Sequence, residues 1–320
     1  MTRRAAVQAP RSRSEARAWG TDRLRQAGLD DRAAWVEADL LLRHAAALTR
    51  EELLLRPAVP LPREAAEAYA VLIARRAAGW PAAYLTGRRE FCGLPLDVDA
   101  RVLIPRPETE RLVEVVAAAL AARPAPLIVD VGTGSGAIAL ALAHRLPAAR
   151  VIGIDLSADA LEVARSNAAR LGLADRIDWL GGDVLEPLAG RIGRGGADAI
   201  CANPPYVPTP EIGALAREIR DHEPMGALDG GPDGLAVHRR IAGAAAAYLR
   251  PGGLLALETS ALGDQARAVA ALIASQGTFA PAEIVLDYAG FQRVVIAERL
   301  LDAAAPSMRG GRVAGMGGGE

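Results

Sequence analysis

The stretch whose residue types point most directly to a chemistry is Asn203-Pro204-Pro205-Tyr206. It follows an apolar run at 197–202 that is typical of a buried strand. Proline fixes φ and has no N–H, so the segment cannot continue a β-ladder and its carbonyl groups stay free to accept hydrogen bonds. The Asn203 side-chain oxygen and the Pro204 carbonyl can accept the two hydrogens of a planar –NH2 group, and the Tyr206 ring can lie against the flat group that carries it. The pattern predicts a site that holds an amide or an amino-purine while its nitrogen reacts.

A glycine-rich turn lies upstream, between an apolar run of strand type at 127–131 and an apolar run of helix type at 137–143. Its residues are Gly132, Thr133, Gly134, Ser135 and Gly136. A strand, a glycine turn and a helix form the first unit of a nucleotide-binding α/β fold, in which the glycines let the backbone approach a ligand closely. The G-x-G-x-G spacing lacks the extra residue of the dinucleotide fingerprint, which disfavours a dehydrogenase. It suits S-adenosylmethionine, a ligand that has no pyrophosphate to be held.

Acidic residues follow the next two apolar runs. Asp155 ends the run at 151–154, roughly 20 residues past the glycines, where an acid can bind ribose hydroxyls. Asp183 and Val184 follow the run at 177–180. Asp183 can accept a hydrogen bond from an adenine amino group, and Val184 can pack on the adenine ring. Together with the glycine turn, these residues predict a site for S-adenosylmethionine as methyl donor.

The chain contains both motifs, and it resembles the class I S-adenosylmethionine-dependent methyltransferases. More narrowly, it resembles the HemK/PrmC family of protein-(glutamine-N5) methyltransferases, which modify peptide chain release factors. The resemblance runs from about residue 37 to residue 298. It includes the stretches 79–87 and 223–235, and its more specific stretches are 90–94 and 102–110. The stretch 102–110 favours the release-factor branch, because the sister family that modifies a ribosomal protein departs from this pattern.

The resemblance implies a role for each residue of the two motifs. It implies that the methyl donor is bound by Gly132, Thr133, Gly134, Ser135, Gly136, Asp155, Asp183, Val184 and Asn203. It implies that the substrate glutamine, which belongs to the GGQ tripeptide of class-1 release factors, is bound by Asn203, Pro204, Pro205 and Tyr206. Asn203, Pro204 and Tyr206 are the expected catalytic residues, and S-adenosyl-L-homocysteine is the expected product. The chain departs from the family at His222, where an aromatic residue is usual, and in a rewritten, longer stretch at 258–265.

Two further functions stay open from the residues alone. The same Asn-Pro-Pro-aromatic pocket serves adenine-N6 methyltransferases, but these need base extrusion and a basic binding face. The net charge of −1 offers no such overall field, so we expect no nucleic acid partner. The second is a donor-binding regulatory protein without turnover, which the complete pair of motifs disfavours.

The composition indicates the class of protein and the compartment in which it folds. The 320 residues are 51% hydrophobic and 23% charged, as in a globular protein of one large and one small domain. Cys92 and Cys201 have no metal spacing, and the histidines show none either, so we expect no metal and a reducing, cytoplasmic compartment. No run of 18 or more apolar residues occurs, so we expect no membrane partner. We expect a monomer.

The elements that must position these residues follow from periodicity. The pattern predicts a helical bundle for substrate recognition at 14–87, a β-hairpin linker at 88–105 and a methyltransferase domain at 106–302, between disordered tails at 1–13 and 303–320. Alternating strands and helices predict an α/β fold, a Rossmann-like, doubly wound seven-stranded sheet closed by an antiparallel pair at 284–286 and 294–296. The pattern predicts helices at 108–121 and 265–275, and a turn at 251–253 before a strand at 254–257. Ligands of such sheets bind at the carboxyl ends of the strands, where both motifs lie.

Overall fold

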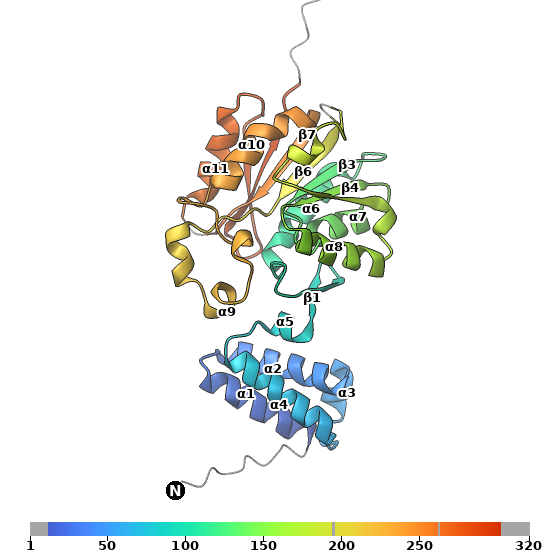
Figure 1. The fold of residues 1–320 in the computed structure, drawn as a ribbon, viewed down its shortest axis with the longest axis vertical. Coiled ribbons are helices and arrows are strands. Elements are labelled where there is room, and N and C mark those ends of the chain that lie inside the picture. Colours follow the sequence, from blue (N-terminus) through green and yellow to red (C-terminus); the bar gives the residue numbers. More distant parts are fainter. Residues whose placement is uncertain (1–11, 194–195, 262, 302–320) are drawn as a thin grey trace, which may run out of the picture.

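The computed structural model describes residues 12–193, 196–261 and 263–301. A bundle of helices lies at one end of the molecule and the sheet domain at the other, with α5 on the side of the bundle that faces the sheet domain and β1 after it (Figure 1). The helices of the bundle are α1 (Arg13–Gln26), α2 (Asp31–Ala46), α3 (Arg50–Leu55), α4 (Arg63–Ala77) and α5 (Ala82–Thr86). The predicted tail at 1–13 is too long, because Ser12 caps α1 in a capping box with Glu15 and Arg13 begins the helix. The rest of that tail and the one predicted at 303–320 lie outside the described residues.

The bundle packs around the buried Tyr69. The hydroxyl of Tyr69 donates to the Ala38 carbonyl of α2, 3.2 Å away, and its ring lies edge-on against Trp19. A Cβ at Gly20 would come within 1.8 Å of the Tyr69 oxygen. This contact explains a glycine in the middle of α1, where it costs about 1 kcal/mol of helix stability relative to alanine.

The predicted hairpin is present but shorter than the sequence indicated. β1 (Arg88–Phe91) pairs with β2 (Leu94–Asp97) in antiparallel register. Cys92 and Gly93 between them have φ of 51° and 79°, as a two-residue hairpin turn of the primed type requires. The strand pairing ends at Asp97, and the remainder of the predicted linker runs without regular structure toward the sheet domain.

Seven described strands form one mixed sheet in the order β5-β4-β3-β6-β7-β9-β8. They are β3 (Leu127–Val131), β4 (Arg150–Asp155), β5 (Ile177–Gly181), β6 (Ala197–Ala202), β7 (Leu249–Glu258), β8 (Glu283–Leu286) and β9 (Gln292–Glu298). β3 to β7 are parallel, and β9 is antiparallel to both β7 and β8. This confirms the predicted doubly wound sheet. β7 starts earlier than expected, because the predicted turn at 251–253 is accommodated as an irregularity in its pairing with β6.

Helices cover both faces of the sheet. α6 (Glu110–Leu120) and α7 (Ala137–Arg145) pack with Ile128 and Cys201 on one face. α10 (Ala236–Tyr248) and α11 (Gln265–Ser275) pack with Val129 and Ile200 on the other. Neighbouring strand residues thus alternate between two apolar layers, as a sheet buried on both sides requires. α8 (Ala158–Arg170) lies beside β4 and β5.

Two segments differ from the sequence-based prediction. The helix expected from residue 108 begins with a 3-10 turn, η1 (Pro107–Thr109), before α6. The segment between β6 and α10 contains the short elements η4 (Thr209–Ala214), α9 (Arg217–Arg220) and η5 (Met225–Ala227), which had no periodic signal. Within the described ranges, every helix is too short or too polar to cross a membrane.

Candidate active site

A cavity of about 310 Å³ lies at the carboxyl ends of β3, β4 and β6. Its wall contains Val131, Gly132 and Gly134 after β3, Asp155 at the end of β4, and Asn203 and Pro205 after β6. Both sequence motifs therefore meet at one cavity, although 66 residues lie between Gly136 and Asn203 in the chain. This is the position at which open α/β sheets bind their ligands.

The three glycines of the turn all have left-handed backbone conformations. Gly132, Gly134 and Gly136 have φ of 71°, 56° and 83°. Residues with a Cβ rarely adopt these angles, so the turn needs glycine at every second position. Gly132 and Gly134 line the cavity.

The residues between the glycines hold the turn rather than line the cavity. The Thr133 hydroxyl donates to Asp130 Oδ2 at 2.6 Å, and the Ser135 carbonyl accepts from the Asn167 side chain at 3.0 Å. Thr133 and Ser135 are buried. Burial also raises the pKa of Asp130 to about 7, although hydrogen bonds from Thr133 and the Ala139 N–H oppose the shift.

Asp155 fixes the glycine turn from the neighbouring strand. Its Oδ2 accepts from the Gly134 N–H at 2.8 Å, and its Oδ1 accepts from the Ser157 N–H at 2.9 Å. An ionised carboxylate has about four acceptor positions, so lone pairs remain for a diol in the cavity. Leu156, next in the chain, is 75% exposed and also lines the cavity.

The segment after β5 supplies the far wall. Gly182, Asp183 and Val184 line the cavity. Val184 has φ of 50°, which is rare for a β-branched residue and marks local strain of the kind found at binding sites. Asp183 Oδ2 pairs with Arg240 at 2.7 Å, which leaves its Oδ1 for another donor.

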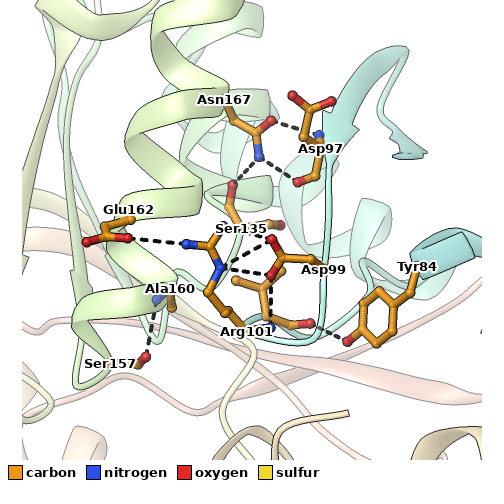
Figure 2. A network of polar contacts seen from close by, with 10 residues as sticks. Tyr84, Asp97, Asp99, Arg101, Ser135, Ser157, Ala160, Glu162 and Asn167 are labelled. Carbon is orange, nitrogen blue, oxygen red and sulfur yellow. Dashed lines mark hydrogen bonds and ion pairs between the residues drawn. The ribbon is translucent and has the colours of Figure 1, made fainter. Parts of the chain in front are cut away.

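The linker forms a wall that the sequence-based analysis missed, because Arg101, Val102 and Leu103 line the same cavity. Figure 2 shows how Asn167 of α8 holds this segment. Asn167 Oδ1 accepts from the Asp97 N–H at 2.8 Å, while its Nδ2 donates to the carbonyls of Asp97 and Ser135, each at 3.0 Å. One wholly buried side chain thus connects the linker to the glycine turn.

Arg101 adds a second attachment in Figure 2. Its guanidinium pairs with Asp99 at 2.7 Å and with Glu162 of α8 at 3.2 Å. The hydrogen bond from Arg101 lowers the pKa of Asp99, although partial burial opposes the shift. The Tyr84 hydroxyl donates to the Val102 carbonyl at 2.6 Å, so the last helix of the bundle also holds this wall.

Asn203 and Pro204 present free acceptors beside the cavity. Asn203 Nδ2 donates to the Thr109 hydroxyl at 3.1 Å, which directs Oδ1 to the opposite side of the amide. Among the described residues, none donates a hydrogen bond to Asn203 Oδ1 or to the Pro204 carbonyl. Two acceptors of the turn therefore have no donor within the described structure, and their role in substrate binding stays a prediction. Thr109 was missed, because it lies 94 residues away in the chain.

The backbone of this turn is held by two glycines and a glutamine. A Cβ at Gly230 would come within 2.8 Å of the Pro205 carbonyl, and one at Gly234 within 2.4 Å of the Tyr206 carbonyl. Gln265 Nε2 donates to the Tyr206 carbonyl at 2.9 Å, while its Oε1 accepts from the Ser260 N–H at 2.7 Å. The rewritten stretch at 258–265 therefore still reaches the turn.

Tyr206 lies outside the cavity wall described above. Burial raises the pKa of its hydroxyl to about 12, and the nearby Glu258 carboxyl adds to the shift. The hydroxyl is therefore neutral at physiological pH and is no proton acceptor there. Its ring remains the part that can contact a flat group.

Glu223 joins the linker to the segment that follows the turn. Its carboxylate accepts from the Ile104 N–H at 3.1 Å and pairs with Arg106. His222, next to it, stacks on Trp80 of the bundle. Arg76 of the bundle pairs with Glu37 of α2 and also with Glu218 of this segment. The Arg76–Glu218 pair and the Trp80–His222 stack therefore connect the bundle to this segment. Across the described ranges, no group of three or more His, Cys, Asp or Glu side chains is arranged to hold a metal ion.

Comparisons with known proteins agree with this geometry. Residues 15–87 match the PrmC N-terminal domain family, and residues 128–223 match a methyltransferase domain family. The release factor glutamine methyltransferase of Moorella thermoacetica is 48% identical over 82% of this chain and 91% of that protein. The protein of the same name from Caulobacter vibrioides is 41% identical over 88% of this chain and 94% of that protein.

Among solved structures, a methyltransferase from Pyrococcus furiosus is similar with a TM-score of 0.45 and 16% identity, over 65% of this chain and 90% of that one. The identity to the curated relatives extends over nearly their whole length, bundle and sheet domain together. The chain therefore belongs to the release factor glutamine methyltransferase family, whose members are S-adenosylmethionine-dependent transferases.

Proposed function

We propose that this protein transfers a methyl group from S-adenosylmethionine to the side-chain nitrogen, N5, of the glutamine in the GGQ tripeptide of a class-1 release factor. The named relatives support this substrate. The observation that carries the proposal is the pair of free acceptors, Asn203 Oδ1 and the Pro204 carbonyl, on a rigid turn at the edge of the donor cavity. A primary amide has two N–H donors that match this pair.

The residues around the cavity fit the donor. Asp155 retains free lone pairs for the ribose hydroxyls, Asp183 retains one oxygen for the adenine amino group, and Val184 offers an apolar surface for the ring. Gly132 and Gly134 expose backbone where the amino-acid part of the donor fits. When bound, S-adenosylmethionine supplies an electrophilic methyl group on a positively charged sulfur.

The chain's own residues contribute to catalysis mainly by orienting the substrate amide nitrogen. A carboxamide nitrogen is a weak nucleophile because its lone pair is delocalised into the carbonyl. Asn203 and Pro204 accept its two N–H bonds and favour a pyramidal nitrogen, with the lone pair directed toward the donor cavity. Holding two reactants in such geometry can lower a barrier by roughly 7–11 kcal/mol. The proton of the methylated nitrogen can leave through the accepting oxygen.

We propose that the protein acts as a monomer in the cytoplasm, on a protein substrate and without nucleic acid or membrane. Cys92 and Cys201 are both unpaired, which fits a reducing compartment. The net charge of −1 disfavours the adenine-N6 alternative, which needs a basic surface for nucleic acid.

Mass spectrometry of the substrate tests the proposal. A class-1 release factor is incubated with the protein and S-adenosylmethionine, digested and sequenced by fragmentation. We expect one added methyl group on the GGQ glutamine, and none on a release factor in which this glutamine is replaced by glutamate. Methylation of an adenine-containing oligonucleotide in the parallel reaction, with an unmodified release factor, would instead support the nucleic acid function. Donor binding without transfer to either would support a regulatory protein.

A further inference from the structure

Glu258 is a buried carboxyl group directly behind the acceptor turn. It ends β7, and the register that pairs Ala202 with Leu257 places Glu258 beside Asn203 at the same edge of the sheet. Its side chain is wholly buried. Among the described residues, no donor forms a hydrogen bond of normal geometry with either of its carboxyl oxygens. A buried group of this kind normally destabilises a fold, so its presence calls for a function.

Charged and titratable groups face Glu258 from several elements. Burial raises its pKa to about 7, and the nearby Thr109 hydroxyl and the Arg293 guanidinium act against this shift. Glu108 raises its pKa, Arg106 lowers it, and Tyr206 lies close enough to be influenced by it. Among the described residues, the ion pair of Arg293 is with Asp287 at 3.1 Å and not with Glu258. The Thr109 hydroxyl is the uncharged donor among the groups that influence Glu258.

Thr109 contacts Asn203 and lies near Glu258. Its side chain is buried, and its oxygen accepts from Asn203 Nδ2 at 3.1 Å. A hydroxyl has one hydrogen to donate. The Thr109 hydroxyl lies near Glu258, both of whose carboxyl oxygens lack a partner of normal geometry among the described residues, so Glu258 can accept that hydrogen. An ionised carboxylate can only accept. A Thr109 hydroxyl that donates to Glu258 can offer Asn203 only a lone pair.

This polarity decides which way the Asn203 amide faces. The two ends of a carboxamide have almost the same shape, so packing alone does not distinguish them. A threonine hydroxyl that donated to Asn203 would hold the amide the other way round and direct its –NH2 at the substrate. Two –NH2 groups cannot hydrogen-bond as partners, since neither has a good acceptor. We propose that Thr109 and Glu258 are positioning residues that fix the Asn203 amide with its oxygen toward the substrate nitrogen, an inference that rests on the proposed function.

Kinetics of matched variants test the proposal. Thr109→Val removes the hydroxyl at nearly constant shape, Thr109→Ser keeps it, and Glu258→Gln removes the obligate acceptor. We expect Thr109→Val to lower kcat at least about tenfold, with KM for both substrates within about twofold of wild type. We expect Thr109→Ser, which keeps the hydroxyl, to have most of the wild-type kcat. Thr21→Val is the control, because it removes a buried hydroxyl of the bundle that donates to the Arg17 carbonyl at 2.9 Å. We expect it to leave kcat unchanged.

The pH profile separates positioning from mere support of the fold. Protonated Glu258 can donate to Thr109, which releases the constraint on Asn203. We therefore expect wild-type kcat to fall as the pH drops below about 7, and Glu258→Gln to be slower with this limb removed. Thr109→Val as active as wild type, Thr109→Ser as impaired as Thr109→Val, or an unchanged acid limb in Glu258→Gln would each overturn the proposal.

A second measurement needs neither turnover nor a folded variant. The side-chain amide signals of Asn203 in the ¹H–¹⁵N spectrum of the wild-type protein should shift with pH as Glu258 titrates, with a midpoint near 7. Signals that stay constant between about pH 5.5 and 8.5 would contradict the chain from Glu258 to Asn203. A wild-type protein that methylates no release factor, yet shows this titration, would refute the proposed function and leave the hydrogen-bond chain in place.

Discussion

The imidazole of His222 stacks on the indole of Trp80, with 4.4 Å between the ring centroids and 34° between the planes. Arg75 lies over the same indole, 4.2 Å from its centroid. Trp80 belongs to the segment between α4 and α5, whereas His222 precedes Glu223, whose carboxylate holds the linker. The stack therefore joins the helical bundle to the segment beside the active site. It also explains why the family's usual aromatic residue can be replaced by histidine here.

Removing this stack should weaken binding of the release factor more than it slows methyl transfer. We expect His222→Ala to raise KM for the release factor several-fold and to lower stability by about 0.5–1.5 kcal/mol, the usual contribution of an aromatic pair. His222→Phe should behave as wild type. Steady-state kinetics with both substrates and thermal unfolding measure these effects. A double variant with Trp80→Ala should be no worse than the single ones, and fully additive losses would show that the two rings act separately.

The acceptor turn makes a separate prediction for donor binding and turnover. Asn203→Ala removes Oδ1 but leaves Gly134, Asp155 and Asp183 in the cavity wall. We expect donor affinity within a few-fold of wild type and a loss of most of the turnover. Asn203→Asp should also turn over slowly, because its extra charge disturbs the acceptor geometry. Calorimetry with S-adenosylhomocysteine and the methylation assay give the two quantities. A near wild-type rate in Asn203→Ala would remove the proposed role of this residue.

Asn167 should affect the donor site from outside the cavity wall. Asn167→Leu leaves the Asp97 N–H and the Asp97 and Ser135 carbonyls without their partner. Unsatisfied buried groups typically cost about 1–3 kcal/mol each, so we expect a loss of roughly 2–4 kcal/mol after relaxation. Donor affinity should fall as well, because the linker wall and the glycine turn lose their connection. In the Thr21→Val control, we expect lower stability with donor affinity intact.

Two buried carboxyls predict how stability depends on pH. The pKa values of Asp130 and Glu258 are both raised to about 7 by burial, from ordinary values of 3.8 and 4.5. Between these limits the folded protein holds protons that the unfolded chain has released. The free energy of unfolding therefore falls as the pH rises toward about 7, and this contribution is constant above that value.

Urea unfolding at a series of pH values tests this sign. Relative to wild type, Asp130→Asn should gain stability as the pH rises from about 4 to 7, by at most about 3 kcal/mol. Glu258→Gln should show the same trend. The exposed Asp22→Asn variant serves as a control and should follow the wild-type curve. A constant difference between wild type and Asp130→Asn across the series would show that Asp130 is ionised in the folded protein throughout.

The parts of the fold that could be predicted are those with strong local patterns. β6 at Ala197–Ala202 and α11 at Gln265–Ser275 have the bounds that the sequence predicted, since one is a continuous apolar run and the other has regular helical spacing. The glycine turn and the acceptor turn were predicted from residue types with fixed backbone needs. They meet at one cavity because both follow parallel strands of the same sheet.

The parts that could not be predicted depend on contacts between distant residues. Arg101 lines the donor cavity from a segment without periodicity, and long-range contacts such as its bond to Glu162 and the anchoring of the linker by Asn167 hold it there. The contact between Thr109 and Asn203 has no local signal, because an unexpected 3-10 turn presents the hydroxyl. Buried carboxyls such as Glu258 are equally hidden, since burial is a property of the whole fold.

The three hydrogen bonds of Asn167 have a consequence for how the molecule responds to its donor. Because the hairpin segment and the glycine turn share one anchor, a ligand that orders the turn also stabilises β2. Amide hydrogens of the hairpin should then exchange more slowly with deuterium once the donor is bound, although the hairpin strands themselves lie outside the cavity wall. Loading with donor would thus stiffen the connection to the bundle before the release factor arrives.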